Sequence, residues 1–60
     1  MALYTVNCYL VNLRGAKISE TPTKVISGEW DSTDEAIAAS IQDMVEQYPG
    51  KNVTVEVVEA

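Results

Sequence analysis

Four carboxylates lie within residues 27–36, SGEWDSTDEA, which also hold the only tryptophan of the chain, Trp30. Clustered carboxylates serve two kinds of chemistry in proteins, general acid–base catalysis and calcium binding. Asp31, Asp34 and Glu35 lack the alternating spacing and the central glycine of a calcium loop. The segment therefore predicts no calcium site, and its charge needs another explanation.

The rest of the sequence offers little for catalysis. It has no histidine, which removes histidine-based acid–base catalysis and the commonest transition-metal ligand. The single cysteine, Cys8, cannot form an internal disulfide or a zinc site, and its apolar surroundings predict a buried thiol. The three glycines are isolated, so there is no phosphate-binding loop. We expect a non-enzymatic protein without cofactor or metal.

The acidic segment fits the start of a helix. Ser32 to Glu35 matches a capping box, in which Ser32 accepts a hydrogen bond from the backbone N–H of Glu35 and the Glu35 carboxylate accepts one from the N–H of Ser32. Asp31, Asp34 and Glu35 also suit the positive end of the helix dipole, which contributes about 0.3–1 kcal/mol for each. These carboxylates thus have a structural explanation beside any binding role.

The helix predicted from this cap covers residues 32–48. Its apolar residues recur at helical spacing, and Pro49-Gly50 ends it. The spacing predicts a core-facing stripe of Ile37, Ile41, Met44, Val45 and Tyr48.

Three segments show the alternation of β-strands. The first, residues 3–13, is the most apolar and places Tyr4, Val6, Cys8 and Leu10 on its core face. A loop within 14–22 leads to the second strand at Thr23–Ser27, with an extension to Trp30 left open, and the third strand covers Asn52–Val58.

The order β-β-α-β predicts a single α+β domain, residues 1–60. The helix must cover one face of a three-stranded antiparallel sheet, because neither element can bury its apolar side alone. Pro22 argues against a central position for the second strand, so the predicted sheet order is 2-1-3. The opposite face, with Tyr9 and Val11, is then either an ordinary half-exposed surface or an interface for a dimer or a partner.

The charge of the chain is concentrated in its middle. Residues 25–50 carry six acids and no base, or −6, whereas the remainder carries four bases and three acids, or +1, which gives the net charge of −5. Binding nucleic acid or an anionic membrane directly would need a coherent basic patch, so both are disfavoured. The chain has no long apolar run and no basic-then-apolar leader, and we expect a soluble cytoplasmic protein.

Helix capping does not explain Asp43 and Glu46, which fall in the last turns, where the dipole favours cations. With Glu35 they predict an acidic stripe about 16 Å long on the outer side of the helix. The stripe is either a solvated surface or a docking surface for a basic partner. Trp30 likewise either covers the end of the core or forms an exposed aromatic anchor beside the acids.

The hairpin, the helix start with Asp31-Ser32 and Glu35-Ala36, and the Tyr48-Pro49-Gly50 stop before a last strand resemble short β-β-α-β proteins of phages and mobile elements. In size and acidity the chain is also similar to small phage inhibitors, such as anti-CRISPR and anti-restriction proteins. Some of those present carboxylates where a target expects DNA phosphates. The resemblance transfers no catalytic or binding residue to this chain.

We therefore expect a protein-binding module whose acidic helix face engages a basic partner, such as a nucleic-acid-binding CRISPR or restriction component that it inhibits as a DNA mimic. The alternative is a structural domain that forms a homodimer through the sheet face at Tyr9 and Val11. The residues predicted to bind the partner are Glu29, Trp30, Asp31, Asp34, Glu35, Asp43 and Glu46.

Overall fold

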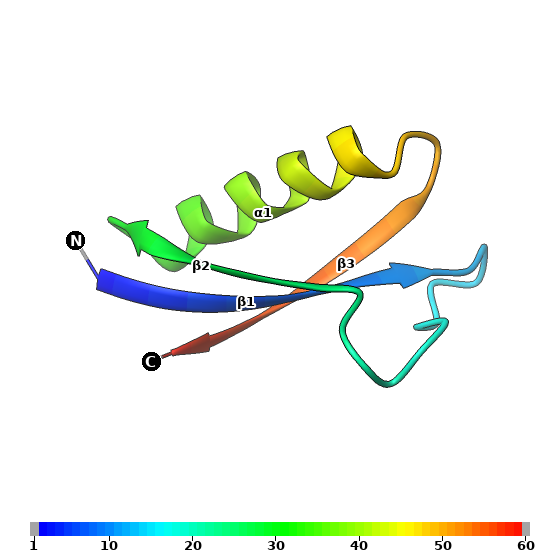
Figure 1. Cartoon of the computed structure of the whole chain (residues 1–60), viewed down its shortest axis with the longest axis horizontal. Helices are drawn as coiled ribbons and strands as arrows, with labels where there is room; N and C mark the ends of the chain where they lie inside the picture. The colour runs from blue at the N-terminus through cyan, green and yellow to red at the C-terminus, as the bar shows by residue number, and fades with distance from the viewer. Residues whose placement is uncertain (1, 60) are drawn as a thin grey trace.

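The computed structural model describes residues 2–59 and shows one helix lying across a three-stranded sheet (Figure 1). Along the chain the elements are β1 (Ala2–Val11), β2 (Lys24–Trp30), α1 (Thr33–Gln47) and β3 (Asn52–Glu59). The sheet order is β2-β1-β3, and both pairings are antiparallel. The predicted α+β fold, the sheet order and the central position of the first strand are confirmed, and β2 reaches Trp30, the longer of the two predicted extents.

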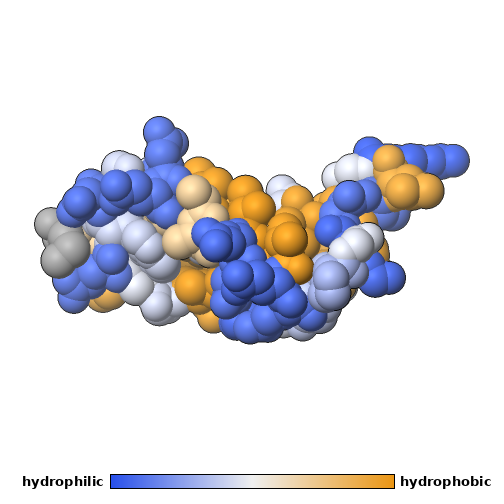
Figure 2. All heavy atoms as spheres, turned by 90° about the horizontal axis from the view of Figure 1, so that it is seen from above, coloured by the Kyte–Doolittle hydropathy of each residue, from blue (hydrophilic) through white to orange (hydrophobic). Residues whose placement is uncertain are grey.

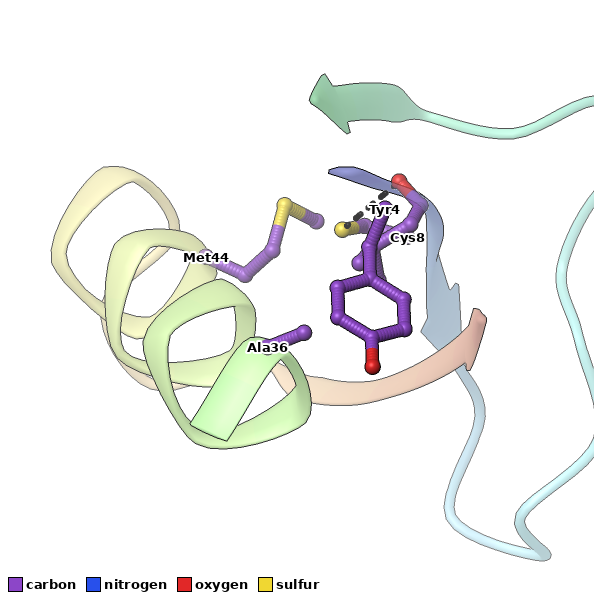
Figure 3. Close-up of a cluster of buried hydrophobic side chains, with 5 residues drawn as sticks. Tyr4, Cys8, Ala36 and Met44 are labelled. Carbon is purple, nitrogen blue, oxygen red and sulfur yellow. Dashed lines mark hydrogen bonds between the residues drawn. The ribbon is translucent and has the colours of Figure 1, made fainter. Parts of the chain in front are cut away.

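The core lies between β1 and α1. Val6 of β1 pairs with Ile26 on one side and with Val57 on the other, so the three strands bring apolar side chains together beneath the helix. In Figure 3, Met44 and Ala36 of α1 point toward Cys8 and Tyr4 of β1. The buried core consists of Tyr4, Val6, Cys8, Ala36 and Met44, with Leu10, Ile26, Trp30, Tyr48, Val53, Val55 and Val57 partly buried around it.

The helix faces the sheet with a different stripe from the one predicted. Ala36, Ser40 and Met44 are fully buried, whereas Ile41 and Val45 keep 37% and 48% of their surface exposed. The prediction was right for Met44 and wrong for Ile41 and Val45. Part of the bulk at this contact comes from the sheet, since the ring of Tyr4 lies beside the small side chain of Ala36 (Figure 3).

The segment between β1 and β2, residues 12–23, descends on the side of the sheet away from α1 (Figure 1). It begins with a turn in which Gly15 has a φ of 82°, a conformation that glycine adopts without strain. Pairing resumes briefly afterwards, because Lys17 forms a bridge with Val11 and the N–H of Ile18 donates to the carbonyl of Leu10 at 3.0 Å.

This segment covers one end of the sheet face that was expected to be open. The ammonium group of Lys17 lies 4.1 Å from the centre of the Tyr9 ring, and its Nζ lies 3.6 Å from a carboxylate oxygen of Glu56. Tyr9 is only 6% exposed, and Val11 is half-buried. The expectation of an open face at Tyr9 is therefore wrong, because a cation from the loop packs on the aromatic ring.

Candidate protein-binding surface

The start of α1 is capped largely as predicted. Ser32 has an extended backbone, and its hydroxyl accepts from the N–H of Glu35 at 3.2 Å. The Glu35 carboxylate accepts from the N–H of Asp31 at 3.0 Å rather than from that of Ser32. The return bond of the predicted capping box is thus shifted by one residue, and it ties the helix start to the chain just after β2.

Asp43 does not belong to an outer acidic stripe. Lys24 Nζ of β2 donates to Asp43 Oδ2 at 2.6 Å, and both side chains are about one-third exposed, at 32% and 38%. Lys24 pairs with Cys8 in the β1–β2 register, so its side chain is on the helix side of the sheet. The predicted solvent-facing position of Asp43 is wrong, because a cation from another element draws this carboxylate toward the sheet edge.

The Lys24–Asp43 pair lies close enough to Cys8 to act on its titration. Burial is the main cause that raises the pKa of the Cys8 thiol above its ordinary value of 9.0. The negative charge of Asp43 raises this pKa further, and the positive charge of Lys24 lowers it. Cys8 is a fully buried free thiol whose Sγ lies 3.8 Å from the carbonyl oxygen of Val6, and these surroundings favour its neutral form.

Four acids gather around the turn from β2 into α1, and we call them the acidic corner: Glu29, Asp31, Asp34 and Glu35. All four are exposed. Glu46 is exposed as well, but it lies eleven residues beyond Glu35 on α1, about 16 Å along the helix axis. The ion pairs among residues 2–59 are Lys17–Glu56 and Lys24–Asp43, and neither involves these five acids.

Trp30 matches the core-covering interpretation. It is half-buried and packs against the core cluster on the helix side of β2. Its ring lies directly over Gly28, where an added Cβ would be 2.9 Å from ring atom Cη2. Glycine at position 28 therefore leaves the space that lets the indole lie back on its own strand, and this packing buries part of the ring.

The sheet face away from the helix exposes apolar side chains other than Tyr9 and Val11, the residues of the predicted dimer interface. Leu3 is 56% exposed, Val25 53% and Val58 44%. They come from three different strands, and the register pairs Val25 with Asn7 and Val58 with Thr5. Because polar residues separate them, these side chains are typical of scattered surface apolar residues.

Comparison of the chain with protein-family models, with curated proteins and with solved structures finds no match. The part of the chain that the structure describes contains no pocket and no group of three or more side chains placed to hold a metal ion. No helix within residues 2–59 combines the length and apolar character needed to cross a bilayer.

Proposed function

We propose that the protein is a non-enzymatic binding module that engages a basic surface of a partner protein through its acidic corner. The observation that carries the proposal is the concentration of Glu29, Asp31, Asp34 and Glu35 within residues 29–35, all exposed and without an ion pair among residues 2–59. The helix dipole offsets only about half an elementary charge at this end, so the corner stays strongly negative.

The chemistry of the corner indicates the class of partner. Carboxylates at this density attract lysine and arginine side chains, and electrostatic attraction of this kind speeds encounter and selects among partners. A nucleic-acid-binding protein, whose basic surface is spaced for phosphates, is the partner class that we propose, and occupying such a surface would inhibit it. Glu46, about 16 Å from Glu35 along the helix axis, lies outside the proposed contact, and Asp43 takes no part because Lys24 already neutralises it.

The test compares two double variants of equal charge change as baits for affinity capture from cells that carry the gene. Glu29→Lys with Asp34→Lys neutralises the net charge of the corner and spares Ser32 and Glu35, whose side chains cap the helix. Glu20→Lys with Glu46→Lys is the control, since both residues are exposed and lie outside the corner.

The captured protein is then purified, and its affinity for each bait is measured at several salt concentrations. The corner variant should bind at least about tenfold more weakly at low salt and lose most of the salt dependence, whereas the control should resemble the wild type. Equal affinity of the wild type and the corner variant would refute the proposal.

A further inference from the structure

The side of α1 that faces away from β2 exposes apolar side chains. Successive helix residues are about 100° apart, so Ile41 and Val45 lie on one flank while Asp43, held by Lys24 of β2, lies on the other. Because β2 and β3 are the two edges of the sheet, the flank with Ile41 and Val45 is the one above β3. Figure 2, which looks onto the helix side, shows apolar atoms exposed in the middle of this face.

β3 continues this apolar surface along the edge of the sheet. Val53, Val55 and Val57 pair with core positions of β1 and face the helix, yet each remains partly exposed. We call these three valines, with Ile41 and Val45, the β3 edge surface. The valines that pack against the core on this side are therefore still partly in contact with water.

The backbone of β3 is also open on this side. β3 pairs with β1 alone, so within residues 2–59 no strand meets its other edge. Natural sheets protect such edges with proline, inward-facing lysine or a bulge. The segment Asn52–Glu59 contains neither proline nor lysine, and its eight residues form an uninterrupted strand of about 27 Å.

We propose that a second copy of this chain covers the β3 edge surface. The two β3 strands pair antiparallel about a two-fold axis at Val55, which joins the two sheets into one of six strands with both α1 helices on the same face. In this register Val55 faces the partner's Val55, Val53 faces the partner's Val57 and Thr54 faces the partner's Glu56.

The register follows from the side chains of β3. Residues directly opposite in an antiparallel pair share a face, so only registers that match valine positions with each other keep Val53, Val55 and Val57 beneath the helices. An axis at Glu56 would place two carboxylates directly opposite each other, and an axis at Thr54 would place Lys51 opposite Val57. An axis at Val55 avoids both conflicts.

Charge favours a second copy as the occupant. Two chains of net charge −5 repel each other, so association through a surface with few acids costs the least. The flank of α1 above β3 meets this condition from Ile37 to Tyr48: its other members are Ala38, Ile41 and Val45, and none is charged. A partner rich in basic residues would instead place its charges against valine and isoleucine and leave them unpaired.

The required area explains why the helix has to take part. A stable interface buries about 800 Å² on each partner, which is about a fifth of the 4073 Å² surface of this chain. A single strand edge is too narrow to supply that area by itself. Val45 and Ile41 therefore meet their counterparts across the axis, and a substitution on the helix should weaken the dimer even though it leaves the strand unchanged.

The test is sedimentation of the full chain over a concentration series, with Val45→Glu compared with Val25→Glu. The two valines are similarly exposed, at 48% and 53%, but Val25 lies on the opposite sheet face and on the other edge strand. We expect the wild type and Val25→Glu to form a dimer of twice the 6.5 kDa chain mass, and Val45→Glu to dissociate at least about tenfold more readily. Circular dichroism verifies that both variants are folded.

Hydrogen exchange of the β3 amides provides a second readout that needs no variant. Alternate residues of an antiparallel strand direct their N–H groups to opposite neighbours, so half of the β3 amides face β1 and half face the free edge. In the dimer both halves are protected, and protection of the outer half falls on dilution. A chain that stays monomeric at about 0.5 mM, or a dimer weakened equally by both variants, overturns the proposal.

Discussion

At the β2 edge of the sheet, Lys24 reaches across to Asp43 of α1 and closes the side of the core with an ion pair. Among residues 2–59 no ion pair joins β3 to the helix, since Glu56 of β3 pairs with Lys17 of the loop, and Ile41 and Val45 of the same helix remain partly exposed above the strand. One helix therefore presents two different flanks, because Asp43 is turned toward β2, and Ile41 and Val45 are turned toward β3.

The same contrast appears in the side chains of the two edge strands. β2 has a glycine at position 28, and the indole of Trp30 occupies the space above it. β3 has valine at positions 53, 55 and 57, which face the helix, and all three stay partly exposed. The β2 side thus carries an ion pair and an indole beside the core, whereas the β3 side carries only valines beneath the exposed Ile41 and Val45. The following predictions test this difference.

Of the substitutions considered, the one with the largest expected effect on stability is at Met44, on the buried side of α1 between its two flanks. Met44 is fully buried and fills the centre of the helix–sheet contact. Met44→Ala should lower the free energy of unfolding by about 2–5 kcal/mol, since it removes transfer free energy and leaves a cavity. Ile41→Ala, on the flank above β3, should cost less than about 1 kcal/mol under conditions where the chain is monomeric. Urea unfolding at low protein concentration measures both, and similar losses for the two would contradict the proposed difference in burial.

An effect of intermediate size is expected at Gly28. A Cβ there would lie 2.9 Å from the Trp30 ring, so the indole would have to move from the edge that it covers. Gly28→Ala should lower the free energy of unfolding by about 1–3 kcal/mol and shift the tryptophan fluorescence to longer wavelength. Gly50→Ala cannot serve as a control, because the φ of Gly50 is 79°, and a substitution on the ordinary backbone of Ser27 is the better comparison.

Ser40 lies on the buried side of α1, between its two flanks, and we expect it to lower the stability of the fold. Its side chain is fully buried, and its hydroxyl has no hydrogen-bond partner. Ser40→Ala removes this unsatisfied group at a helical position, so it should raise the free energy of unfolding by about 1 kcal/mol. Thermal and urea unfolding should agree on the sign. A loss of stability would show that the hydroxyl is satisfied in solution.

The sequence predicted the order of elements because its signals there are local. Pro22 placed the second strand at an edge, and Ser32 with Glu35 marked the helix start. The side of the helix that meets the sheet, by contrast, is not determined by nearby residues in the sequence. Apolar spacing favoured Ile41 and Val45, but the contact buries Ala36 and Ser40, because part of the bulk comes from Tyr4 of the sheet.

The prediction of an outward-facing Asp43 was wrong for a related reason. Asp43 has no cation near it on the helix. The segment that carries acids and no base, residues 25–50, begins directly after Lys24. The partners are 19 residues apart, and only the antiparallel register of β2 brings them together. The burial of Tyr9 could not be predicted from its neighbours in the sequence either, because it depends on the path by which the loop returns Lys17 to the sheet.

The smallest effect is expected in the pH dependence of stability, through Cys8. Its pKa is raised in the folded protein, so above the ordinary value of 9.0 the unfolded chain loses a thiol proton that the folded chain keeps. The unfolded state then binds fewer protons, and stability must fall as the pH rises, by at most about 1.4 kcal/mol per pH unit. Subtracting the curve of Cys8→Ala isolates this slope from other groups that titrate in the same range.

Removing the charge of Asp43 or of Lys24 should change the fall of stability with pH in opposite directions. Asp43→Asn removes a charge that raises the pKa of Cys8, so the loss of stability above pH 9.0 should become shallower or end earlier. Lys24→Met removes a charge that lowers this pKa, so the loss should continue to higher pH. Each needs its own Cys8→Ala double variant as reference. If neither substitution changes the slope, the ion pair that closes the β2 side does not form beside Cys8 in solution, and the two sides differ less than the structure indicates.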